Sequence, residues 1–93
     1  MIAGFRDADA ERLWKTGVSR RVPANLRRVV LRKLLHLQNA GQLSDLRVPP
    51  GNRLETLSGD RSGQHSIRIN DQFRICFIWR DGNAYEVEIV DYH

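Results

Sequence analysis

The spacing of hydrophobic residues along the chain changes near residue 52. Before that point, apolar residues recur at intervals of three and four, which is typical of one face of an α-helix. After it, they tend to recur at every second position, as they do along a β-strand with one buried face. The pattern therefore predicts helices in the first half of the chain and strands in the second half.

The first half opens with a short apolar stretch over residues 1–5, which we predict to be a strand. A helix is predicted within residues 7–17. Asp7 or Asp9 is suited to cap its first turn, and Gly17 is suited to end it.

A longer helix is predicted over residues 23–41, where the periodic pattern is most extended. Pro23 suits the first helical position, and Gly41 suits the position after the end. Between Arg20 and Lys33 the chain has six basic residues and no acidic residue. The apolar residues at helical spacing, which should face a core, are Leu26, Val30, Leu34 and Leu37.

In the second half, turn-forming residues separate four predicted strands, at residues 53–57, 64–69, 73–80 and 84–92. The Asp-Gly-Asn sequence at 81–83 is typical of a tight hairpin turn. The predicted fold class is α+β, in a single domain over residues 1–93. An N-terminal strand and two helices would pack on a small, mostly antiparallel C-terminal sheet.

Alternation along these strands sorts the side chains between the two faces of the sheet. Arg68 and Arg74 fall on one face, where we expect them to lie side by side and to suit phosphate binding. The alternative is that both are solvated arginines balanced by Glu86 and Glu88. The other face, which should pack against the helices, is predicted to hold Ile67, Ile69, Phe73, Ile75, Phe77, Trp79, Tyr85, Val87 and Ile89.

The charge balance favours a polyanionic partner. Fifteen basic residues, thirteen of them arginine, outnumber eleven acidic residues and give a net charge of +4. Such a balance attracts nucleic acid through phosphate neutralisation, and the alternative is an ordinary soluble basic protein.

The composition also excludes several classes of protein. The single cysteine, Cys76, excludes an internal disulfide and a cysteine-based metal cluster, and we expect it to be a small buried hydrophobe. No apolar run reaches the roughly 18 residues that a membrane span needs. The N-terminus has no secretory signal pattern, so we expect a cytoplasmic protein without membrane contact.

Two internal histidines are weak candidates for chemistry. His36 lies in the basic stripe of the longer predicted helix, and His65 lies on the core side of its strand. No pair of histidines has the spacing of metal ligands. We therefore predict no metal site and no cofactor.

The last three residues, Asp91, Tyr92 and His93, combine an acid, a phenol and an imidazole. An imidazole exchanges protons near neutral pH, and Arg68 and Arg74 are suited to hold negative charge on phosphorus. This set suits cleavage of a phosphodiester by a neighbouring 2′-hydroxyl, which requires RNA. The alternative is a solvated tail, the usual state of a chain terminus.

These residues and their surroundings resemble the HigB toxins of bacterial toxin–antitoxin pairs, within the RelE/ParE superfamily. The resemblance spans essentially the whole chain. It is most specific in GDRSGQHSIRIND (59–71), RICFIW (74–79) and VEIVDYH (87–93). It implies a metal-independent, ribosome-dependent endoribonuclease that enters the decoding site of the small ribosomal subunit and cleaves mRNA there. It also implies a HigA-like antitoxin with a helix-turn-helix domain, so that operator DNA is bound only through the antitoxin complex.

The resemblance extends to individual residues. Asp91, Tyr92 and His93 match the family's closing acidic-aromatic-histidine run, Arg74 matches its phosphate-facing arginine, and Gln72 falls where relatives often have asparagine. The residues assigned to catalysis are His93, Tyr92, Asp91, Arg74 and Glu55. The residues assigned to RNA contacts are Arg68, Gln72, Arg61 and Arg53.

Two positions depart from the pattern of the family. Glu55 falls where some members have a histidine, and Ser58 falls where a lysine is frequent. A glutamate can act as a general base but adds negative charge beside an RNA backbone, and loss of the lysine weakens phosphate binding. We therefore expect a working but mild nuclease.

Two other functions remain as alternatives. ParE-type members share the fold but poison DNA gyrase and do not cut RNA, and fold alone does not settle function. The Asp91–His93 ending together with Arg74 favours the nuclease. A purely regulatory nucleic-acid-binding protein is less favoured, because the sequence has no aromatic stacking platform and no recognition-helix signature.

Overall fold

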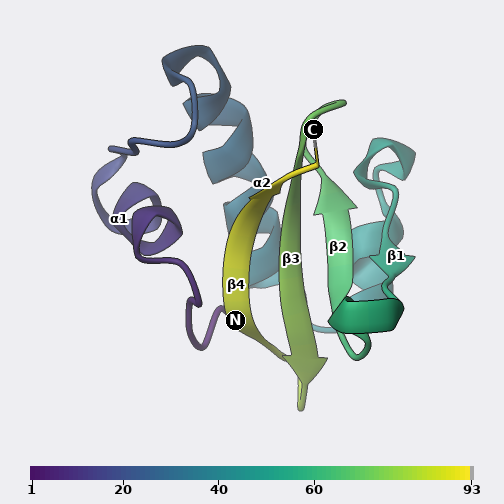
Figure 1. Cartoon of the computed structure of the whole chain (residues 1–93). Coiled ribbons are helices and arrows are strands. Elements are labelled where there is room, and N and C mark those ends of the chain that lie inside the picture. Colours follow the sequence, from purple (N-terminus) through teal and green to yellow (C-terminus); the bar gives the residue numbers. More distant parts are fainter. Residues whose placement is uncertain (93) are drawn as a thin grey trace.

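The computed structural model describes residues 1–92. Its elements are the helices α1 (Ala8–Thr16) and α2 (Arg27–Asn39) and the strands β1 (Glu55–Thr56), β2 (His65–Arg68), β3 (Phe73–Arg80) and β4 (Asn83–Asp91). The strands form one antiparallel sheet in the order β1-β2-β3-β4. Figure 1 shows α2 behind the sheet and α1 beside the edge that β4 forms. The predicted α+β fold class, with two helices on a small antiparallel sheet, is confirmed.

Helix α1 begins and ends where the sequence predicts, whereas α2 is shorter than the predicted range 23–41, since it ends at Asn39 and Ala40 follows it in an extended conformation. The side chain of Asp7 accepts a hydrogen bond of 2.9 Å from the backbone N–H of Asp9, which caps α1. Gly17 follows α1 with φ of 80°, a conformation that costs a residue without a Cβ little. The longer helix starts with a 3₁₀ turn, Ala24–Leu26, before the α-helix proper begins at Arg27.

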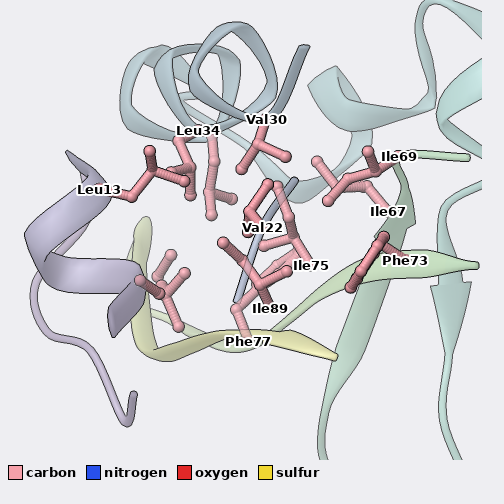
Figure 2. Close-up of a cluster of buried hydrophobic side chains, with 14 of the residues drawn as sticks. Leu13, Val22, Val30, Leu34, Ile67, Ile69, Phe73, Ile75, Phe77 and Ile89 are labelled. Atoms are coloured by element: carbon pink, nitrogen blue, oxygen red, sulfur yellow. The ribbon is translucent and has the colours of Figure 1, made fainter. Parts of the chain in front are cut away.

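The core lies between α2 and the sheet. Val30, Leu34 and Leu37 of α2 are fully buried, as their helical spacing predicts. Figure 2 shows α2 on one side of this cluster and the sheet on the other, with Leu13 of α1 entering from the side. The strands supply Ile67, Phe73, Ile75, Phe77, Val87 and Ile89. Segments outside the sheet supply Val22, Leu46 and Ile69.

An irregularity in β4 changes one predicted side-chain orientation. The pairing of β3 with β4 shifts register between Cys76 and Ile78, and Glu86 takes a left-handed φ of 50°. Ala84 and Val87 therefore both face the core, although they are three residues apart. The prediction that Tyr85 shares the core face is wrong, because the extra residue of this bulge turns Tyr85 to the other side, opposite Ile78.

The N-terminal residues run beside β4 but do not form the regular strand that we expected. Two isolated parallel bridges join Ile2 to Ala84 and Phe5 to Val87. The bulge at Glu86 lies between these two bridges and interrupts a continuous ladder. The expected N-terminal strand is therefore not confirmed.

The first strand of the sheet is shorter than predicted, and turns fill the segments around it. Arg53 has a left-handed φ of 45°, so extended backbone begins only after it. The hairpin predicted at residues 81–83 is present, since Asp81 and Gly82 both have positive φ, 53° and 77°. Within residues 1–92, no helix is long and apolar enough to cross a membrane.

Candidate active site

The face of the sheet turned away from α2, called the open face below, carries the polar residues of the central strands. Arg68 of β2 and Arg74 of β3 are direct cross-strand partners, as the alternation predicts. Two residues further along these strands, four residues stand in register across the whole sheet: Glu55, Ser66, Cys76 and Glu88. The open face therefore brings arginines and carboxylates from four strands together.

Arg74 lies near the start of β3, and three groups fix its orientation. Its Nε donates to Oγ of Ser66 at 2.8 Å, and its Nη2 donates to the backbone carbonyl of Arg53 at 2.7 Å. The same Nη2 lies 3.8 Å from Oε1 of Glu55. Because only 14% of the Arg74 side chain is exposed, the guanidinium is held with little rotational freedom.

Glu55 lies at the rim of the site, with 56% of its side chain exposed. Its carboxylate partly neutralises Arg74 and is accessible to solvent. In chemical terms, a solvent-accessible carboxylate beside an arginine can accept a proton while the arginine holds an anion. Ser58, the other departure from the family pattern, is also exposed.

Tyr92 turns back over β3 after the end of β4. Its backbone N–H donates to the carbonyl of Gln72 at 2.7 Å, and its phenol oxygen lies 3.7 Å from Sγ of Cys76. Figure 1 shows this end of the chain crossing from β4 toward β2. Tyr92 is 47% exposed, but partial burial of the phenol, and then its contact with Cys76, raises the pKa of Tyr92. Since even an ordinary tyrosine phenol has a pKa of about 10, this group carries a proton at neutral pH.

Asp91 and Gln72 hold the end of β4 against the turn between β2 and β3. Nε2 of Gln72 donates to Oδ2 of Asp91 at 3.0 Å. This contact brings together two of the residues that the sequence assigned to the site. His93 lies outside the described residues.

Two of the remaining assigned arginines, Arg61 and Arg68, have carboxylate partners within the protein. Arg61 contacts Glu88 at 3.5 Å, and Arg6 contacts the same oxygen at 3.6 Å. Arg68 forms an ion pair with Asp71. The alternative in which Glu86 and Glu88 balance Arg68 and Arg74 is wrong, because the carboxylate beside Arg68 belongs to Asp71 and the carboxylate beside Arg74 belongs to Glu55.

Arg53 has a backbone role that the sequence did not predict. The prediction gave it an RNA contact, and the structure shows its backbone carbonyl holding Arg74 while its side chain is exposed.

Sequence reasoning missed two supporting residues. Ser66 lies two residues before Arg68 and therefore on the same face of β2, and the structure shows its hydroxyl accepting a hydrogen bond from Arg74. Cys76 is fully buried, as predicted, but its thiol also touches the phenol of Tyr92. The alternation of the strands was the available signal for Ser66, while the contact of Tyr92 depends on a turn after β4 that no local pattern marks.

Both internal histidines lie away from the open face. Nδ1 of His65 is 3.1 Å from Oγ1 of Thr56, and its ring centroid lies 6.0 Å from that of Phe77. His36 contacts the buried amide of Asn52 at 3.4 Å. Within residues 1–92, the structure has no group of three histidine, cysteine or acidic residues able to hold a metal ion.

Comparison with known proteins identifies the family of this site. The profile described as the RelE-like toxin of type II toxin-antitoxin system HigB matches residues 3–93. The chain belongs to the HigB toxin family. HigB toxins act in type II toxin–antitoxin systems, so this membership implies an antitoxin partner.

Two named HigB relatives are similar over most of their length. Toxin HigB-1 of Vibrio cholerae is 41% identical over 85 residues, which cover 90% of each chain. Endoribonuclease HigB of Proteus vulgaris is 31% identical over 93 residues, the full length of both chains.

Solved structures support the fold. The crystal structure of a mutant of YafQ from E. coli covers 99% of this chain with a TM-score of 0.65. YafQ from E. coli strain BL21(DE3) covers the same share with a TM-score of 0.58. Because the sequence identity is 9% in each case, these matches show the shared fold alone.

Proposed function

We propose that this HigB-family toxin is a ribosome-dependent mRNA endoribonuclease whose active site is the open face around Arg74. The observation that carries the proposal is the fixed guanidinium of Arg74 beside a protonated phenol, Tyr92, and an exposed carboxylate, Glu55. The family membership and the name of the Proteus vulgaris relative, Endoribonuclease HigB, support it.

The proposed reaction is attack of a ribose 2′-hydroxyl on the adjacent phosphorus. One group removes the proton from the 2′-hydroxyl, and we assign this role to Glu55 or His93. Another protonates the departing 5′-oxygen, a role that suits Tyr92 because a tyrosine phenol carries a proton at neutral pH. Arg74 would hold the negative charge that develops on the phosphate oxygens.

Asp91 and the RNA contacts complete the proposed site. Asp91 would hold the end of β4 in place through Gln72, and Gln72 would also contact the RNA backbone. Arg68, Arg61 and Arg53 would bind neighbouring phosphates, and RNA would replace their present ion pairs where these exist. Because bound phosphate competes with Glu55 for Arg74, the site is expected to be a mild nuclease.

The ribosome has a defined part in this proposal. The ribosome would hold the mRNA in the decoding site and so orient the scissile phosphate, which the exposed residues of the open face do not do by themselves. The proposed activity uses no metal and no cofactor, and the protein would act in the cytoplasm, where translation takes place. The proposed neutralising partner is a HigA-like antitoxin with a helix-turn-helix domain, through which the complex binds operator DNA.

Primer extension on a defined mRNA, with and without programmed ribosomes, tests this function. The expected result is cleavage within the decoding site when ribosomes are present and no cleavage of the naked mRNA. A toxic protein that cleaves under neither condition would contradict the nuclease. A supercoiling assay would then test the gyrase-poison alternative.

A further inference from the structure

Ser66 is an unusual residue to find in the middle of a sheet. It is fully buried, with 0% of its surface exposed, and it lies between Glu55 and Cys76 in the cross-strand register. A buried hydroxyl lowers stability unless a hydrogen bond compensates for its lost water contacts. The group that forms a hydrogen bond with the Ser66 hydroxyl therefore indicates why a polar residue stands at this buried position.

The partner of Ser66 is the guanidinium of Arg74, whose Nε donates to the serine oxygen at 2.8 Å. The other two buried polar residues among those described, Ser19 and Asn52, bond to groups outside the candidate site. Ser19 donates to Asp9 and accepts from the backbone of Val22. Ser66 thus differs from them, because its bond holds a proposed catalytic side chain.

The bond from Nε to Ser66 restricts the orientation of the guanidinium plane, which the contact at Nη2 alone leaves free. Nη2 of Arg74 is held by the carbonyl of Arg53, which fixes one corner of the guanidinium plane. A second fixed corner, Nε on Ser66, together with the covalent bond from Nε to Cδ, restricts rotation of the plane about the first. The remaining nitrogen, Nη1, then has one defined direction, which a phosphate oxygen in the site would meet.

We propose that Ser66 is a positioning residue for Arg74, which sets the guanidinium plane for transition-state contact with the RNA phosphate. The proposal rests on the proposed nuclease function. Ser66 itself does not touch the RNA. Its loss should therefore lower the rate of cleavage without weakening the binding of the protein to ribosomes.

A double-mutant cycle tests the proposal directly. Ser66→Ala removes one buried oxygen and should lower the single-turnover rate of mRNA cleavage on ribosomes about tenfold to a hundredfold. The ribosome concentration that gives half the maximal rate should stay the same. In an Arg74→Lys background, which lacks Nε–H, Ser66→Ala should cause no further loss. An equal loss in both backgrounds, or full activity of the single mutant, would overturn the proposal.

Two variants separate positioning from simple stability. Ser66→Thr keeps the hydroxyl and should recover most of the rate that Ser66→Ala loses. Ser19→Ala removes a buried serine outside the site, so it should lower the melting temperature while the cleavage rate stays within about twofold of the original protein. A loss of cleavage in Ser19→Ala as large as that in Ser66→Ala would contradict a specific role for Ser66.

A measurement on the free protein distinguishes failure of this inference from failure of the nuclease function. In a proton–nitrogen correlation NMR spectrum, the Arg74 Nε–H should exchange slowly with solvent. Ser66→Ala should speed that exchange about tenfold, and Ser19→Ala should leave it unchanged. Unchanged exchange in Ser66→Ala would overturn the positioning role whatever the enzyme assay shows. Absence of ribosomal cleavage by the original protein would instead overturn the proposed function.

Discussion

At the scale of single residues, the candidate site depends on small buried groups that hold larger functional ones. Ser66 and Cys76 are adjacent cross-strand partners, and both are fully buried. One bonds to the guanidinium of Arg74, and the other touches the phenol of Tyr92. The spacing of these two small residues therefore sets the relative positions of the proposed anion-binding group and the proposed acid.

The role of Tyr92 predicts the effect of removing its hydroxyl. Tyr92→Phe should lower cleavage on ribosomes about a hundredfold, because the departing 5′-oxygen would lose its proton donor. Tyr85→Phe is the matched control, since Tyr85 stacks against Arg80 at 4.6 Å through its ring. Single-turnover kinetics would check both variants. Equal rates for Tyr92→Phe and the original protein would exclude Tyr92 as the acid.

His65 predicts a pH dependence of stability. Burial lowers its pKa, so the folded protein holds the imidazole proton less tightly than the unfolded chain does. The contribution of the neutral His65 ring to the free energy of unfolding is therefore fully present above the ordinary imidazole pKa of about 6.5. It is lost as the pH falls through the lower pKa of the folded protein. His65→Gln should therefore lose less thermal stability than the original protein between neutral pH and about pH 5. Thermal melts in which both proteins lose the same stability would contradict this.

At the scale of elements, local sequence patterns account for the helices and the central strands. The cap at Asp7, the stop at Gly17 and the apolar stripe of α2 could be predicted because each depends on neighbours within a few residues. The pairing of Arg68 with Arg74 followed from strand alternation. The face of Tyr85 could not be predicted, because strict alternation fails at the bulge and only the left-handed conformation of Glu86 reveals it.

The candidate site was predictable to a similar extent. Alternation placed Arg74 on a face away from the helices. The contacts of Arg74 with the Arg53 carbonyl and with Glu55 were not predictable, because they join segments about twenty residues apart through a turn. The partners of Arg61 and Arg68 also depend on this three-dimensional arrangement. Hence a pattern of charges in the sequence can indicate a site for a polyanion. It does not show which of the arginines form ion pairs with carboxylates of the same protein.

The bulge in β4 predicts a stability difference between substitutions at Glu86. A β-branched residue fits poorly at a φ of 50°, so Glu86→Val should lower the free energy of unfolding by about 1–2 kcal/mol. Glycine tolerates this conformation, so the free energy of unfolding of Glu86→Gly should be no more than about 0.5 kcal/mol below that of the original protein. Urea unfolding of the two variants would show the difference. Greater stability for the valine variant would argue against the bulge.

At the scale of the whole molecule, the hydrophobic core and the candidate active site lie on opposite faces of the sheet. One face of the sheet packs against α2 and forms the core, and the open face carries the arginines and the end of β4. Substitutions on the open face can therefore change activity with little effect on the core. The net charge of +4 adds attraction to RNA over longer distances, so binding to ribosomes should weaken as salt increases.

In the proposed mechanism, cleavage depends on Arg74 and not on positive charge in general. Arg80 offers the matched control, because it lies on the same strand and is exposed at the far end of β3. The most direct measurement is the single-turnover rate of mRNA cleavage on programmed ribosomes for Arg74→Ala and Arg80→Ala. We predict a loss of about a hundredfold or more for Arg74→Ala and a change within about twofold for Arg80→Ala. Equal rates for the two variants would contradict an active site centred on Arg74.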